Sequence, residues 1–286
     1  MVFFTRKYTL MPVIITATDF SEVAENAVKY ACQLAADQDA SVIILHSFIV
    51  PIAFSDTPMP VMPIDDSRQI AEDRMRKQIQ ELHTAYPSLG ITGKIMYGDI
   101  IDSLEEYIED EGAPWLIVLG NSGTGEESSL WLGSTALSAL KNLPHPVIAI
   151  PPDSKYNGVK KICFACDYKH VTGSLPTQHL LDIVKHTGAE LHILNVDHNN
   201  KGVDPEAPLE TEKLNEYMAP ANPQYHFVDD ANTDDAINAF VESNHMDWLV
   251  VIPHKHSFFE GLFHKSHVKA MVKKSHVPIL ALHDAG

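Results

Sequence analysis

The chain has 286 residues, of which 45% are apolar and 21% charged, a composition typical of a globular protein long enough for two domains. Its 38 acidic residues outnumber 21 basic ones, and the formal net charge of -17 argues against nucleic acid or an anionic membrane as a partner. The sequence shows neither an apolar run of about 18 residues nor a signal-peptide pattern at its start, so we expect no membrane span and a cytoplasmic location.

Short β-branched runs alternate with longer segments of helical period through the first half of the chain. Strands are predicted near residues 13–16, 42–48, 91–96, 116–119 and 147–150. Helices are predicted near residues 22–36, 67–86, 100–111 and 134–142. The proline-rich stretch 51–63 is predicted to be a long surface loop, because proline neither continues a helix nor pairs within a central strand. This alternation is typical of a doubly wound parallel sheet.

The second half of the chain repeats the first. An apolar run followed by Asp19 returns before Asp167, and Trp115 with its apolar run returns as Trp248 with another. The Pro/Gly-rich stretch 151–158 between the repeats is suited to a linker. We therefore predict an α/β fold of two tandem doubly wound domains, each with a mainly parallel five-stranded sheet. The predicted domains span residues 1–152 and 153–286.

Three cysteines are too few for the disulfide framework of a small secreted domain. Cys163 and Cys166 form a CxxC pattern, but they belong to an apolar run typical of a buried strand, on which residues three apart face opposite ways. We interpret them as buried small hydrophobic side chains, as is usual for free cysteine. A redox pair or a zinc site is the less favoured alternative.

A glycine-rich loop follows the fourth predicted strand. Ligands of an open parallel sheet bind beyond the carboxyl ends of the strands, where the winding reverses. Gly120 and Gly123 let backbone N–H groups approach a phosphate, and Gly133 precedes a helix whose N-terminus suits an anion. Ser134 and Thr135 add hydroxyl donors at that helix start. The loop therefore predicts a phosphate site.

The spacing G-x2-G-x9-G-S is similar to the nucleotide-binding motif of the universal stress proteins. It fits Gly120, Gly123, Gly133 and Ser134. The segments Thr18-Asp19-Phe20-Ser21 and Leu45-His46-Ser47 resemble the family's turns after its first two strands. Because the likeness covers both halves, the chain is identified as a tandem member of that family. The resemblance implies flavodoxin-like, Rossmann-related domains that form a pseudo-dimer whose final strands pair.

The resemblance also implies an adenine-nucleotide site in the first domain. In ATP-binding members, the Asp after the first strand and the residue after the strand-two His flank the ribose and adenine, while the glycine loop holds the phosphates. Carried over to this chain, the implied nucleotide-binding residues are Thr18, Asp19, Ser47, Gly120, Ser122, Gly123, Gly133, Ser134 and Thr135.

The implied ligand is ATP, ADP or AMP, with Mg²⁺ as a further component. Glu126 and Glu127 lie in the loop that should face phosphates, and inward-pointing carboxylates would weaken the binding of a triphosphate, so AMP and ADP suit the site as well as ATP. Asp19 has a second interpretation as the cap of the first helix.

In the second half, other residues occupy the glycine positions. Pro253, His256 and Ser266 replace the three glycines, and His267 replaces Ser134. Proline lacks an amide donor and the side chains fill the space of a phosphate, so we expect nucleotide binding to be lost there. A cluster of lysines and histidines marks this region, and a solvated basic helix is the favoured interpretation. Alternatives are an anion site or a divalent-metal site at His254, His256, His264 and His267.

The sequence matches no Walker A pattern and contains no identifiable pair of nucleophile and base. We therefore predict a stress-response protein that binds an adenine nucleotide for regulation and is not an enzyme, with slow ATP hydrolysis still compatible with the sequence. The alternatives are an ATP-dependent hydrolase or transferase of the same superfamily and a ligand-free interaction scaffold. Internal pairing of the domains, with homodimerisation as a further option, completes the predicted partners.

Overall fold

The first half of the computed structural model alternates strands and helices as the sequence predicts. The structure describes residues 11–49, 64–121, 134–166, 176–197, 207–253 and 276–283. The elements of the first half are β1 (Val13–Ala17), α1 (Glu22–Asp37), β2 (Ser41–Phe48), α2 (Ile64–Ala85), β3 (Ile91–Tyr97), α3 (Ile100–Glu111), β4 (Leu116–Gly120), α4 (Ser134–Asn142) and β5 (Val147–Ile150). The predicted bounds are confirmed to within a few residues. The predicted loop 51–63 lies outside the described residues.

The second half has the same alternation. Its elements are β6 (Lys161–Ala165), α6 (Thr177–Thr187), β7 (Glu190–Asp197), α7 (Ala207–Met218), the 3-10 helix η1 (Ala219–Ala221), β8 (Gln224–Asp229), α8 (Thr233–Ser243), β9 (Trp248–Val251) and β10 (Ile279–Ala281). Trp115 immediately precedes β4 and Trp248 begins β9, so the repeat seen in the sequence is also a repeat of elements.

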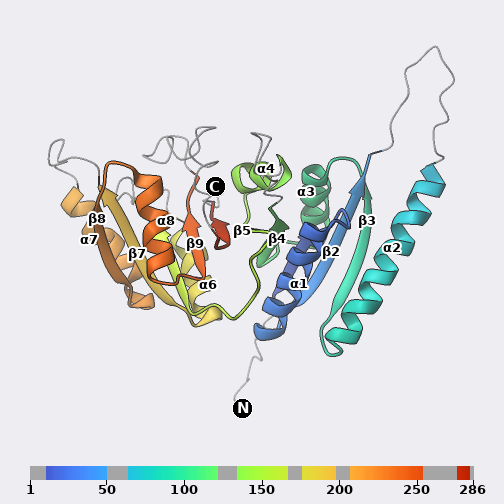
Figure 1. The fold of residues 1–286 in the computed structure, drawn as a ribbon, viewed down its shortest axis with the longest axis horizontal. Coiled ribbons are helices and arrows are strands. Elements are labelled where there is room, and N and C mark those ends of the chain that lie inside the picture. Colours follow the sequence, from blue (N-terminus) through green and yellow to red (C-terminus); the bar gives the residue numbers. More distant parts are fainter. Residues whose placement is uncertain are drawn as a thin grey trace, which may run out of the picture.

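The strands form one continuous sheet in the order β3-β2-β1-β4-β5-β10-β9-β6-β7-β8. Every strand pair within a half is parallel. The halves meet where β5 and β10 pair antiparallel, with Ile148 opposite Leu280. Figure 1 shows this meeting point between the blue-to-green half and the yellow-to-red half. The predicted pairing of the final strands is therefore observed.

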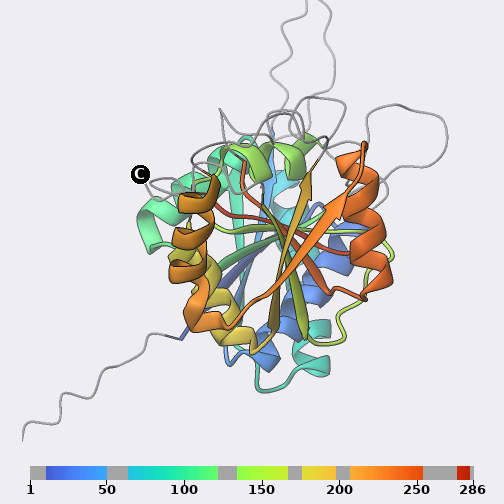
Figure 2. The ribbon, with the colours of Figure 1, turned by 90° about the vertical axis from the view of Figure 1, so that its left-hand side faces the viewer.

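Helices cover both faces of the sheet, which Figure 2 shows twisted between them. One hydrophobic core contains buried side chains of α1, α2, α6 and α7, and the other contains those of α3, α4 and α8. Cys163 lies in one core and Cys166 in the other, and both are buried and outside any disulfide. The interpretation of the CxxC pattern as two buried side chains that face opposite ways is confirmed.

The linker between the halves is attached to helix α1 by hydrogen bonds. Asn26, which is 8% exposed, donates from its amide nitrogen to the Pro151 carbonyl at 3.2 Å and to the Ser154 carbonyl at 2.9 Å. Its amide oxygen accepts a hydrogen bond from Lys155 Nζ at 2.6 Å. These bonds satisfy a buried amide that would otherwise be costly to bury, and they hold the linker against the first half.

Two tryptophans that the sequence repeat aligns lie between the halves, but the strand registers place them one residue apart: Trp248 pairs with Ile162 in the way that Leu116, not Trp115, pairs with Ile14. Trp248 is fully buried, and its indole N–H donates to the Tyr30 hydroxyl of α1 at 2.7 Å. Trp115 is partly buried, and its ring lies 5.5 Å from that of His186 on α6. The Trp115 indole nitrogen is buried without a hydrogen-bond partner among the described residues.

Candidate functional site

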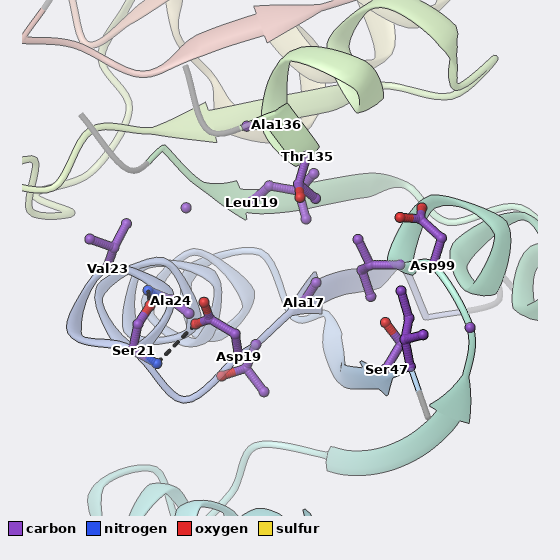
Figure 3. A pocket seen from close by; sticks show the side chains of 15 residues that line it. Ala17, Asp19, Ser21, Val23, Ala24, Ser47, Asp99, Leu119, Thr135 and Ala136 are labelled. Carbon is purple, nitrogen blue, oxygen red and sulfur yellow. Dashed lines mark hydrogen bonds between the residues drawn. The ribbon is translucent and has the colours of Figure 1, made fainter. Parts of the chain in front are cut away.

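A cavity of about 480 Å³ lies at the carboxyl ends of β1, β2, β3 and β4. The strand order shows why it forms there: β2 and β3 extend the sheet to one side of β1, while β4 and β5 extend it to the other. The connections after β1 and β4 therefore diverge and leave a crevice between them. Figure 3 shows the side chains of Asp19, Ser47, Asp99 and Thr135 around this opening.

The cavity brings together residues that are far apart in the sequence. Five predicted site residues line it, namely Thr18, Asp19, Ser47, Gly120 and Thr135. Ser134 is the first residue of α4, next to Thr135. The predicted Ser122, Gly123 and Gly133 lie outside the described residues, as do His254, His256, His264 and His267 of the second half.

The turn after β1 is held in one conformation by its own side chains. The Thr18 hydroxyl accepts a hydrogen bond from the Phe20 N–H at 3.0 Å, and the Asp19 carboxylate accepts one from the Ser21 N–H at 2.9 Å, drawn in Figure 3. Phe20 has a φ of 62°, a left-handed conformation that non-glycine residues seldom adopt. The turn leaves Asp19 exposed at the cavity with one carboxylate oxygen engaged.

Ser21, rather than Asp19, caps helix α1. The Ser21 hydroxyl accepts a hydrogen bond from the Ala24 N–H at 3.3 Å, and Glu22 and Glu25 complement the dipole of the first turn. The alternative interpretation of Asp19 as the helix cap is therefore wrong, because its carboxylate accepts a hydrogen bond from the N–H of Ser21, the N-cap residue itself, which directly precedes the helix. Ser21 and Ala24 also line the cavity, so the start of α1 forms one of its walls.

Gly120 is required by the packing of α1 on β4. A Cβ atom at this position would lie 2.9 Å from the Val23 carbonyl oxygen and 3.1 Å from a methyl carbon of the same residue. Sequence reasoning assigned Gly120 to a close approach of phosphate, and the structure adds a reason that concerns the protein alone. A side chain at residue 120 would displace the first turn of α1 and, with it, the cavity wall.

The third strand contributes a part of the cavity that the sequence motif missed. Gly98 and Asp99 follow β3 and line the cavity beside Ile100. Asp99 is the N-cap of α3, and its carboxylate accepts a hydrogen bond from the Ile101 N–H at 2.8 Å. The signal that could have found them is the general rule that every strand of such a sheet ends at the same edge.

Two carboxylates and several hydroxyl groups define the polarity of the described cavity lining. Asp19 and Asp99 are its charged side chains, and Thr18, Ser21, Ser47 and Thr135 supply hydroxyls. Each carboxylate keeps one oxygen that can accept further hydrogen bonds, such as those from the hydroxyl or amino groups of a ligand. The positive end of the α4 dipole faces the same space from Ser134 and Thr135. The cavity thus combines an acceptor-rich side with an anion-favouring helix start.

The described part of the chain holds no group of three or more His, Cys, Asp or Glu side chains placed to bind a metal ion. Among the described residues, no helix has the length and apolar character needed to cross a membrane.

The fold and the cavity define a doubly wound α/β protein with a crevice at the switch point of its first half. The chain belongs to the universal stress protein family, whose model matches residues 11–151 and again 158–283. Universal stress protein MJ0531 of Methanocaldococcus jannaschii is 25% identical over 148 residues, covering 50% of this chain and 83% of the relative.

Solved structures are similar over nearly the whole chain. A universal stress protein from Archaeoglobus fulgidus has a TM-score of 0.67 at 19% identity, with 95% of this chain and 96% of that chain covered. A putative universal stress protein from Pseudomonas aeruginosa has a TM-score of 0.59 at 13% identity, with 96% and 93% covered. At these identities the likeness concerns the fold, and it extends across both halves.

Proposed function

We propose that the first half of this stress protein binds an adenine nucleotide in the cavity at the ends of β1 to β4. The observation that carries the proposal is the convergence of three separate sequence motifs on one cavity: Asp19 after β1, Ser47 at the end of β2, and Gly120 with Thr135 around β4 and α4. The cavity volume of about 480 Å³ falls within the range of roughly 300–1,000 Å³ typical of ligand pockets.

The two sides of the cavity suit the two ends of a nucleotide. The free carboxylate oxygens of Asp19 and Asp99 accept hydrogen bonds from ribose hydroxyls or from an amino group, and they would repel a phosphate at the same place. The phosphates therefore lie toward the N-terminus of α4, where backbone N–H groups, the helix dipole and the Thr135 hydroxyl favour an anion. The nucleoside lies between β1, β2 and β3.

The cavity favours holding a nucleotide over hydrolysing it, so we propose a regulatory role. Of its described lining residues, none is a histidine, lysine or arginine, so the serine and threonine hydroxyls have no imidazole or amine base among them and a phosphate has no cationic side chain to hold it. One oxygen of each carboxylate is already bonded to the backbone, at Ser21 and at Ile101. Purified protein should release phosphate from ATP far more slowly than about 1 per second, and sustained release near that rate would contradict this role.

Calorimetric titration with ATP, ADP and AMP tests the site. We expect one nucleotide per chain, and Asp19→Asn should weaken binding by about tenfold to a hundredfold, because a charge-assisted hydrogen bond is lost while the side-chain shape is kept. The matched control is Asp167→Asn, the corresponding change in the second half, which should leave the affinity unchanged. An absence of binding by the unaltered protein would overturn the proposal. An equal loss in both variants would show that the site is not confined to the first half.

A further inference from the structure

We infer that His46 is a positioning residue for the cavity, because its imidazole holds the Thr18 carbonyl and thereby fixes the turn that carries Asp19. The inference deepens the proposed function, since it names a residue that supports the nucleotide site without lining it. His46 Nδ1 lies 2.7 Å from the Thr18 carbonyl oxygen. A carbonyl oxygen can only accept, so the Nδ1 atom bears the proton and donates it.

At the end of β2, the neighbouring side chains of His46 and Ser47 lie on opposite faces of the sheet. Ser47 lines the cavity, whereas His46, the preceding residue, points to the opposite face, as alternation along a strand requires. There its ring packs against Phe20, with ring centroids 4.6 Å apart. Phe20 is the left-handed residue of the turn after β1. His46 therefore contacts this turn twice, at the Thr18 carbonyl and at the Phe20 ring.

The hydrogen bond from the His46 side chain to the Thr18 carbonyl, which we call a bracket, has an equivalent in the second half of the chain. There it is made by a different side chain. Asn195 Nδ2 donates to the Cys166 carbonyl at 3.0 Å. The registers are equivalent, because Ala17 pairs with Leu45 next to the first bracket and Ala165 pairs with Leu194 next to the second.

The backbone bonds beside the two brackets also correspond. The Thr18 N–H donates to the Leu45 carbonyl at 2.8 Å, and the Cys166 N–H donates to the Leu194 carbonyl at 2.9 Å. The fold therefore uses a side-chain donor at this place in both halves, and asparagine meets the requirement as well as histidine. The donor itself, rather than the imidazole ring, is the shared element.

This equivalence predicts which substitutions keep the site. His46→Asn keeps a donor of the kind that the second half already uses, whereas His46→Leu leaves the Thr18 carbonyl without that donor. Thr18 is only 5% exposed, so water cannot readily replace the lost bond.

Two readouts test the inference, one with nucleotide and one without. By calorimetry, His46→Leu should bind nucleotide about tenfold more weakly than the unaltered protein, and His46→Asn should restore most of the affinity. Asn195→Leu is the matched control: it removes the equivalent bracket of the second half and should leave the affinity unchanged. If His46→Leu does not fold, His46→Ala is the donor-free variant to measure.

The second readout is hydrogen exchange at the Phe20 and Ser21 amides, which bond the Thr18 hydroxyl and the Asp19 carboxylate. Exchange should accelerate in His46→Leu and return toward normal in His46→Asn. A His46→Leu protein with unchanged affinity and unchanged exchange would overturn the inference, as would a His46→Asn protein as impaired as His46→Leu. Absence of nucleotide binding by the unaltered protein would overturn the proposed function, and the exchange data would still decide whether His46 positions the turn.

Discussion

The two halves share a scaffold and differ in what surrounds equivalent residues. The brackets at the ends of β2 and β7 are the same in geometry although one uses histidine and the other asparagine. The tryptophans near the starts of β4 and β9, by contrast, do not occupy equivalent places, because the strand registers match Trp248 with Leu116. Trp248 is hydrogen-bonded to Tyr30 across the boundary between halves, while the Trp115 indole nitrogen has no partner among the described residues. The backbone requirement at the strand ends is therefore the same in both halves, whereas the contacts between the halves are asymmetric.

The largest effect of this asymmetry on the free energy of unfolding should come from truncating the two tryptophans. Trp248→Ala should lower the free energy of unfolding by about 3–5 kcal/mol, because a fully buried ring and its hydrogen bond are lost. Trp115→Ala should cost clearly less, since Trp115 is only partly buried. Urea denaturation followed by circular dichroism measures both values. Equal losses in the two variants would contradict the asymmetry.

A smaller effect should isolate the hydrogen bond between Tyr30 and Trp248. Burial raises the pKa of Tyr30, so the phenol stays neutral and its oxygen accepts a hydrogen bond from the Trp248 indole N–H. Tyr30→Phe leaves a buried indole N–H without an acceptor and should cost about 1–3 kcal/mol of unfolding free energy. The control is Trp115→Phe, which removes an indole N–H that has no described partner. If both changes proved equally costly, the bond would not distinguish the two tryptophans.

The two neighbouring histidines His192 on β7 and His226 on β8 should make the stability of the second half more sensitive to acid. His192 Nδ1 and His226 Nε2 lie 3.0 Å apart, and Glu190 Oε2 lies 3.6 Å from His192 Nε2. Burial lowers the pKa of His192, with further lowering from His226 and Lys161 against a smaller opposing effect of Glu190; burial likewise lowers the pKa of His226. The folded protein therefore favours the neutral rings. Stability from this pair is present above the ordinary pKa of about 6.5 and is lost as the pH falls through the lowered values.

The matched variant for this pH effect is His192→Ile, since isoleucine occupies the equivalent place in β2 as Ile43. Unfolding free energies at pH 7.5 and pH 5 should differ less in His192→Ile than in the unaltered protein. His145, whose pKa is lowered by burial and by His179, contributes acid sensitivity of the same sign to both proteins and cancels in the comparison. An identical pH dependence would show that the histidine pair does not respond to acid.

The smallest difference between the halves should be in thiol reactivity. Burial raises the pKa of Cys32 in the first half and of Cys163 in the second, in each case to about 12. Because the thiolate is the reactive form, neither should react with a thiol reagent at pH 8 in the native protein, and both should react in urea. Rapid labelling of one cysteine in the native state would identify the half that opens more readily.

The sequence predicted the elements of the first half because hydrophobic period and turn residues act locally. The bounds of α1, α3 and α4 follow from apolar spacing and from capping residues such as Ser21 and Asp99. Which residue caps α1 could not be predicted from the sequence, because Asp19 and Ser21 are both of a type that suits an N-cap. Only the geometry of the turn shows that Ser21 is the cap.

Contacts between distant segments could not be predicted from one sequence. Val23 lies over Gly120 because α1 crosses β4, a consequence of strand order that no local pattern encodes. The bond between Tyr30 and Trp248 joins residues 218 positions apart. The bracket at His46 depends on register between β1 and β2, and its equivalent at Asn195 shares no side-chain type with it. The spacing of the sequence motifs therefore predicted where the cavity lies, whereas the contacts that hold its walls in place were found only in the structure.

The antiparallel pairing of β5 with β10, together with the linker held by Asn26, has a consequence for assembly. Two separate copies of such a domain must find each other, and dilution separates them; a tether replaces that encounter with an effective concentration in the millimolar range for short linkers. Each half is thus paired with the other whatever the concentration of the protein. Neither half has to remain complementary to a copy of itself, so one can change its strand-end chemistry while continuing to complete the sheet of the other.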